Sequence, residues 1–106
     1  PISLSLPLCR REVICEPLLE RLDLSRYLAE GRIDSVSCGG ESGDDARVCD
    51  FDWVLDLRRQ CVDAGVAFRF RQTGARLRKE GRIYRIRRQF QHSQARRAGV
   101  DFIVEG

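Results

Sequence analysis

One strongly helical stretch between two apolar runs restricts the fold of this chain more than any other feature. Its apolar residues recur at intervals of three and four, as on one face of a helix: Val54, Leu57, Cys61 and Ala64. Asp50 or Asp52 can cap the start of this helix, and Gly65 ends it. The runs at residues 33–38 and 66–70 are typical of buried strands. The sequence therefore predicts a β-α-β unit with parallel strands.

Further elements extend this alternation in both directions. Residues 13–15 form a short apolar run, stopped by Pro17, which predicts another strand. Asp23 or Ser25 can cap a short helix that ends at Gly31. After Gly74 the pattern weakens. It still indicates a strand within residues 81–87 and a helical turn over residues 93–99. We expect an α/β fold with three to four mostly parallel strands and two to three helices.

The composition fits one domain and excludes several classes of protein. The 106 residues, 42% of them hydrophobic, are enough for one modest core, so we assign residues 1–106 to a single domain. No stretch approaches the roughly 20 apolar residues of a membrane span. Five cysteines without a Cys-x-x-Cys pair argue against a disulfide scaffold and favour a cytoplasmic location. Their apolar surroundings predict core packing, and lone His92 is not a metal centre, so no metal site is expected.

The two halves of the chain differ strongly in charge. Residues 1–68 carry 8 basic and 13 acidic side chains, a net charge of −5. Residues 69–97 carry 11 basic side chains and one acidic, a net charge of +10. Aromatic side chains lie within this basic part, so weak binding of nucleic acid through residues 75–106 is one hypothesis. The other is a solvated surface that balances the acidic half. The arginines concerned are Arg82, Arg85, Arg87, Arg88, Arg96 and Arg97.

Polar and glycine residues follow each of the three predicted strands. Glu16 follows the first, Gly39-Gly40-Glu41-Ser42-Gly43 the second, and Gln72 ends the third. The carboxyl ends of parallel strands lie at the same edge of a sheet, so these residues can share one ligand site. Glycines there can adopt positive φ and turn amides toward an anion, and Glu41 can bind an ammonium group or a sugar hydroxyl. The alternative is a tight turn whose glycines serve only its conformation.

Several of these segments together resemble a known family. Glu16-Pro17-Leu18-Leu19, the Gly39–Gly43 motif followed by Ala46-Arg47, Asp52-Trp53-Val54 and Gln72-Thr73-Gly74 occur in the order and spacing of that family. It is a phage-associated family of unknown function whose barrel is related to radical-SAM enzymes, and the chain resembles its C-terminal half over residues 12–102. The tail, including Gln91, is similar to one branch. The Gly39–Gly43 motif with Trp53 is the specific part.

The resemblance implies the second half of a TIM-like barrel and adds Arg47 to the candidate ligand-binding residues. The ligand it implies is S-adenosylmethionine or a substrate. A complete barrel needs about 200 residues or more, and this sequence has no cysteine cluster with iron–sulfur spacing. We therefore expect a C-terminal fragment that is not catalytic alone. S-adenosylmethionine and an iron–sulfur cluster are expected only in a full-length relative. The expected partner is the missing N-terminal half or a second copy of the chain.

Overall fold

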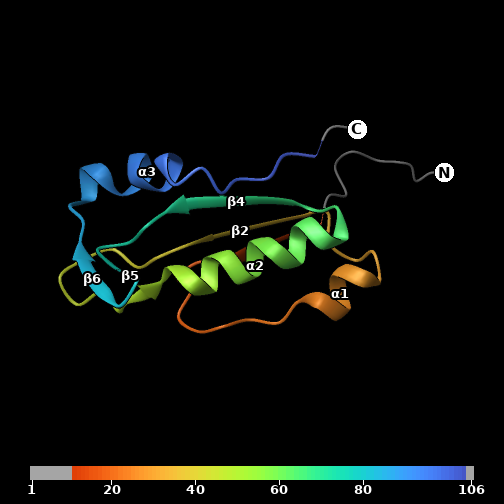
Figure 1. Ribbon diagram of the computed structural model, residues 1–106, viewed down its shortest axis with the longest axis horizontal. Helices are drawn as coiled ribbons and strands as arrows, with labels where there is room; N and C mark the ends of the chain where they lie inside the picture. Colours follow the sequence, from red (N-terminus) through yellow and green to blue (C-terminus); the bar gives the residue numbers. More distant parts are fainter. Residues whose placement is uncertain (1–10, 105–106) are drawn as a thin grey trace.

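The computed structural model describes residues 11–104, which form a mixed α/β structure with a main sheet and a smaller one (Figure 1). Residues 1–10 and 105–106 lie outside the described part, and so do the corresponding ends of the predicted domain and of the basic segment. The main sheet consists of β1 (Glu12–Cys15), β2 (Ser35–Gly39) and β4 (Ala67–Gln72). All three strands are parallel, in the order β1-β2-β4. The predicted α/β class and parallel strands are confirmed.

Helix α2 (Phe51–Ala64) lies between β2 and β4 in the sequence and runs antiparallel to them along one face of the sheet (Figure 1). Asp50 caps it by accepting a hydrogen bond from the Asp52 amide at 2.9 Å. Gly65 ends it in the left-handed region at φ 70°. The predicted apolar face is confirmed except at Ala64, which is exposed.

Gln60 is a buried residue of α2 that the apolar pattern did not indicate. Its side-chain amide accepts a hydrogen bond from the Leu24 amide and donates one to the Leu22 carbonyl, both at 2.8 Å. These bonds hold α2 against the segment that leads into α1 (Ser25–Ala29). A buried amide is tolerated here because its polar atoms are paired.

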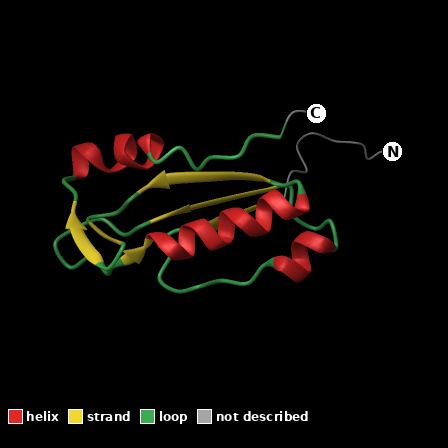
Figure 2. Ribbon diagram, viewed as in Figure 1, coloured by secondary structure: helices red, strands yellow, loops and turns green. Residues whose placement is uncertain are grey.

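The smaller sheet lies where the main strands end (Figure 2). It contains β3 (Cys49–Asp50), β5 (Arg76–Lys79) and β6 (Arg82–Arg85). β3 pairs parallel with β5, and β5 pairs antiparallel with β6 through a two-residue turn at Glu80 and Gly81. Their φ angles of 52° and 79° are those of a tight hairpin turn. The strand predicted within residues 81–87 is confirmed as β6, whereas β3 and β5 were not predicted.

Helix α3 (Arg88–Arg97) packs against β4 and begins earlier than the turn predicted over residues 93–99. Beyond it, the Phe102 amide and carbonyl pair with those of Phe68, and the Asp101 carboxylate accepts the Phe70 amide at 2.8 Å. The outer edge of β4 is therefore covered by the chain's own C-terminal segment, while β1 is the other edge of the sheet.

The core lies between α2 and the sheet face that carries Val36, Cys38, Phe68 and Phe70, all at most 2% exposed. Side chains alternate along a strand, so Ile14 lies on the opposite face, where it is 55% exposed. The sheets of the described residues do not close into a barrel. The assignment to half of a TIM-like barrel stays a prediction. Within residues 11–104, no helix is long and apolar enough to span a membrane.

Candidate ligand site at the strand ends

Side chains from the ends of all three main strands meet at the carboxyl edge of the sheet. Gln72 Nε2 donates a hydrogen bond to Glu16 Oε2 at 3.0 Å, across 56 positions of sequence. The Ser42 hydroxyl lies 3.2 Å from Gln72 Oε1. Glu16, Ser42 and Gln72, which we call the rim triad, thus form one connected polar group.

Gly39 lies directly beneath this group. A Cβ atom at position 39 would lie 2.6 Å from Glu16 Oε1 and 3.0 Å from Gln72 Cγ, both shorter than real contacts allow. The absence of a side chain therefore lets the Glu16 carboxylate settle over the backbone of β2. Arg71 Nε lies 4.0 Å from Glu16 Oε1, and the Glu16 side chain keeps 27% of its surface exposed. This carboxylate can still be reached by a ligand.

Ser37, two positions before Gly39 on the same sheet face, is also unusual. It is only 3% exposed, and its hydroxyl has no hydrogen-bond partner among the described residues. Buried hydroxyls are normally paired, since leaving one unpaired costs roughly 1–3 kcal/mol. The face that leads up to the rim triad therefore contains unused hydrogen-bonding capacity.

Gly40 and Gly74 allow the two neighbouring loops to touch through their backbones. A Cβ at Gly40 would lie 2.4 Å from the Thr73 carbonyl oxygen, and one at Gly74 would lie 2.7 Å from the Glu41 nitrogen. The Gly40 amide donates to the Gln72 carbonyl at 3.1 Å, and the Ala75 amide to the Glu41 carbonyl at 2.9 Å. The loops are thus fixed to each other independently of any ligand.

The expected role of the glycines as positive-φ residues is correct only in part. Gly43 has a φ of 108°, but Gly39 and Gly40 lie outside the left-handed region. At those two positions glycine is required by the close approach of Glu16 and of the Thr73 backbone. Since the Gly40 amide is already bonded to Gln72, it does not point toward a free anion position.

Glu41 is paired within its own loop. Its Oε1 accepts hydrogen bonds from the Arg47 amide at 2.9 Å and from Arg47 Nε at 3.0 Å, and its Oε2 accepts one from Arg47 Nη2 at 2.9 Å. These hydrogen bonds lower the pKa of Glu41 to about 2. The Glu41 carboxylate is therefore engaged by Arg47, and Glu16 is the more available carboxylate at the rim.

Gln91 of α3 supports the rim triad from below, although sequence reasoning gave it no role. Its side chain is buried and accepts a hydrogen bond from the Ser42 hydroxyl at 2.7 Å. Its Nε2 donates to the Ile86 carbonyl at 3.0 Å, and its own carbonyl accepts the Thr73 amide at 3.2 Å. The available signal was its spacing of four residues from Ala95, the other buried residue of α3.

The arginines predicted for nucleic-acid binding lie elsewhere, on and around β6 and α3. All six are exposed, and none forms an ion pair within residues 11–104: Arg82, Arg85, Arg87, Arg88, Arg96 and Arg97. Arg82 lies over the ring of Tyr84, 5.7 Å from its centroid. By contrast, Arg21, Arg47 and Arg59 of the acidic half all contact carboxylates. The charge of this basic surface is thus uncompensated.

The cysteines have the core role that the sequence predicted. Cys38, Cys49 and Cys61 are 0% exposed, and Cys15 packs partly buried beside them. Burial raises the pKa of Cys49 to about 12 and that of Cys61 to about 11. Such thiols stay protonated at neutral pH. No group of three or more His, Cys, Asp or Glu side chains able to hold a metal occurs within residues 11–104.

Fold and site together define an α/β protein with a parallel sheet and a polar group at its carboxyl edge. The chain belongs to the family described as proteins of unknown function, DUF5131, whose model matches residues 4–102. No curated protein and no solved structure matches it.

Proposed function

We propose that this chain supplies one side of a ligand site at the carboxyl edge of the main sheet, with Glu16 as the group that binds the ligand. The hydrogen bond between Gln72 and Glu16 over Gly39 carries the proposal, because it joins the outer strands across the middle one. As part of the same proposal, the family is phage-associated and related to radical-SAM barrels. The chain would then be the non-catalytic second half of such a barrel.

The chemistry of the rim triad defines the class of ligand. The Glu16 carboxylate is an acceptor, and the remaining capacity of the Ser42 hydroxyl and the Gln72 amide is polar and neutral. A ligand that bears an ammonium group or hydroxyls would satisfy these groups, and S-adenosylmethionine bears both. The iron–sulfur cluster of a full-length relative does not fit the described cysteines, because buried protonated thiols are not ligands.

Calorimetric titration of the chain with S-adenosylmethionine tests this proposal. We expect weak binding, with Kd near 1 mM, because only one side of the site is present. Glu16→Gln removes the charge of one hydrogen-bonding partner, which should weaken binding at least tenfold, since hydrogen bonds to charged groups are worth about 1.5–3 kcal/mol. Glu12→Gln is the matched control, because Glu12 begins the same strand at the far end from the rim.

Absence of binding up to about ten times that concentration would contradict the proposal. Equal binding by Glu16→Gln and the wild-type chain would contradict the role of Glu16. Thermal unfolding of both variants, measured alongside, checks that neither substitution acts by unfolding the protein.

A second candidate function, nucleic-acid binding, is favoured by the uncompensated basic surface. A protein that neutralises phosphates releases counterions, so its affinity falls steeply with salt. Neutralising Arg85, Arg87 and Arg88 together should lower affinity about equally for all sequences and reduce the salt slope by up to about three units. Fluorescence anisotropy with labelled single-stranded and duplex oligonucleotides measures both quantities.

The matched control neutralises Arg26, Arg32 and Arg59, three exposed arginines that already contact carboxylates. This control variant should bind like the wild-type chain. No binding at low salt, where the electrostatic attraction is strongest, would exclude the second candidate.

A further inference from the structure

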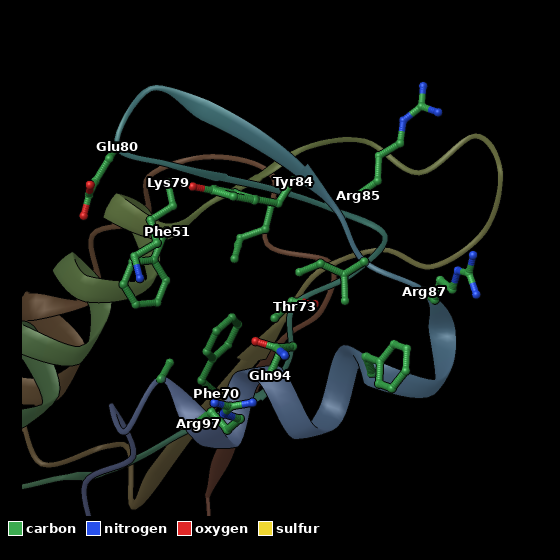
Figure 3. A pocket seen from close by; sticks show the side chains of 14 residues that line it. Phe51, Phe70, Thr73, Lys79, Glu80, Tyr84, Arg85, Arg87, Gln94 and Arg97 are labelled. Atoms are coloured by element: carbon green, nitrogen blue, oxygen red, sulfur yellow. The ribbon is translucent and has the colours of Figure 1, made fainter.

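A cavity of roughly 900 Å³ lies between the β5–β6 hairpin, the start of α2 and the side of α3 (Figure 3). It is separate from the rim triad, none of whose members lines it. In Figure 3, Tyr84 and Lys79 reach down from the hairpin, Phe51 lies at one side, and Phe70 and Gln94 lie opposite the hairpin. This is the principal hollow around the basic surface, and neither candidate function uses it so far.

Aromatic side chains form much of the cavity wall. The rings of Phe51 and Phe70 have centroids 6.1 Å apart and close its inner side. Tyr84 and Phe90 also line it, yet they remain 43% and 49% exposed. Exposed rings beside a cavity offer flat faces for stacking, and every nucleobase has a complementary face.

The charge of the lining is strongly positive. Four basic residues border the cavity, and Glu80 is the only carboxylate among the lining residues: Lys79, Arg85, Arg87 and Arg97. None of the four forms an ion pair with the described residues. Lys79 Nζ lies 5.3 Å from the centroid of the Phe51 ring. An anionic ligand would therefore bind without first breaking a salt bridge.

The orientation of these cations separates two roles. Figure 3 shows Lys79 at the Phe51 side of the cavity and Arg97 beside Gln94 and Phe70, whereas Arg85 and Arg87 point outward from its mouth. Lys79 and Arg97 can thus contact a group held within the cavity. Arg85 and Arg87 are placed to contact a chain that continues outside it.

Gln94 supplies the remaining element of recognition. Its side-chain amide lines the cavity and is exposed, and it forms no hydrogen bond with the described residues. Amide side chains donate to and accept from the edges of nucleobases. A ring stacked on Tyr84 would leave its polar edge free for such a contact.

We propose that this cavity binds a nucleotide, with the base stacked on Tyr84 and the phosphate bound by Lys79 and Arg97. The nucleotide is either free or the end of a single strand, and both share a planar base joined to a phosphate. The proposal deepens the second candidate function, because it rests on the same uncompensated surface, and it is independent of the rim triad.

The test is an NMR titration with AMP, adenosine and inorganic phosphate, and with a short single-stranded oligothymidylate. We expect AMP to shift the amides around Phe51, Tyr84 and Gln94, and to bind more tightly than adenosine or phosphate alone. Tyr84→Ala should weaken AMP binding about tenfold, because stacking on an aromatic ring is worth about 1–3 kcal/mol per base. Tyr27→Ala is the matched control, since Tyr27 is similarly exposed, at 49%, on α1.

Two further variants examine the phosphate. Arg97→Ala should weaken AMP binding but leave adenosine binding unchanged, because adenosine has no phosphate. Arg96→Ala, its exposed neighbour that does not line this cavity, should change neither. Both positions lie on the exposed surface of α3, so loss of folding is not expected.

The outcomes separate this inference from the nucleic-acid candidate. No shift of the cavity amides by AMP, or equal affinity of Tyr84→Ala and Tyr27→Ala, overturns the cavity proposal even if the oligonucleotide still binds. AMP binding without oligonucleotide binding overturns the nucleic-acid candidate and identifies a free nucleotide as the ligand. Binding of both, with only the oligonucleotide weakened by Arg85→Ala and Arg87→Ala, identifies the end of a single strand.

Discussion

Gly40→Ala should strongly destabilise the edge of the sheet that holds the rim triad. The added Cβ would lie 2.4 Å from the Thr73 carbonyl oxygen and 2.8 Å from the Gly74 Cα. Ordinary carbon–oxygen contacts are about 3.3 Å or longer, so one loop must move by about an ångström. Because the atoms in the way are backbone atoms, no side-chain rotation can relieve the contact.

The expected cost follows from two effects. Overpacking typically costs about 1–3 kcal/mol. The required movement also strains the hydrogen bond between the Gly40 amide and the Gln72 carbonyl, which contributes about 0.5–1.5 kcal/mol. We therefore expect a loss of roughly 2–4 kcal/mol in the free energy of unfolding. For a domain of this size, each kcal/mol lowers Tm by about 4–8 °C.

Urea unfolding, followed by circular dichroism, measures this loss, and Gly31→Ala is the control. Gly31 has a φ of 71° with nothing within 4 Å of its missing Cβ, so this variant suffers only the conformational penalty of about 1–2 kcal/mol. If Gly40→Ala costs no more than Gly31→Ala, the close approach of the two loops is not what requires glycine at position 40.

Three further predictions concern other parts of the molecule. Cys49 and Cys61 should react with a thiol reagent at pH 8 only as fast as the chain unfolds, and stability should fall as pH rises from their ordinary pKa of 9.0 toward 11–12; rapid labelling by mass spectrometry would contradict this. Glu41 has a folded pKa of about 2, below its ordinary 4.5, so its stabilisation is present above pH 4.5 and is lost as pH falls toward 2. An NMR titration should show Arg47→Ala returning this pKa toward 4.5, and an unchanged value would refute the pairing. The chain should self-associate through the β1 side of the sheet, and Ile14→Lys should weaken association at least tenfold in sedimentation equilibrium; a wild-type monomer at high micromolar concentration excludes it.

The elements that the sequence predicted well are those with strong local signals. The period of the apolar residues and the flanking Asp50 and Gly65 define α2, and alternation along residues 66–70 identifies β4. β3 has two residues and β5 is mostly basic, so neither has a periodic pattern. These two strands form because they pair with each other, which a local pattern does not contain.

The candidate site shows the same division. That Glu16, Gly39 and Gln72 meet follows from parallel strands, and sequence reasoning could therefore group them. Whether a glycine serves φ or space depends on what approaches it, and Glu16 is 23 positions from Gly39 in the sequence. The engagement of Glu41 by Arg47 likewise depends on the path of a loop. Residue type indicates capacity for chemistry, but the contacts that use it come from the tertiary structure.

The most direct test of the proposed ligand site is one NMR titration with S-adenosylmethionine in which the three strand ends are followed together. If Glu16, Gly40 and Gln72 border one site, their amides should shift with the same apparent Kd, near 1 mM. Amides at the opposite end of the sheet, such as that of Ser35, should stay unchanged. Shifts confined to one of the three loops, or different Kd values among them, would contradict a single ligand site at this edge.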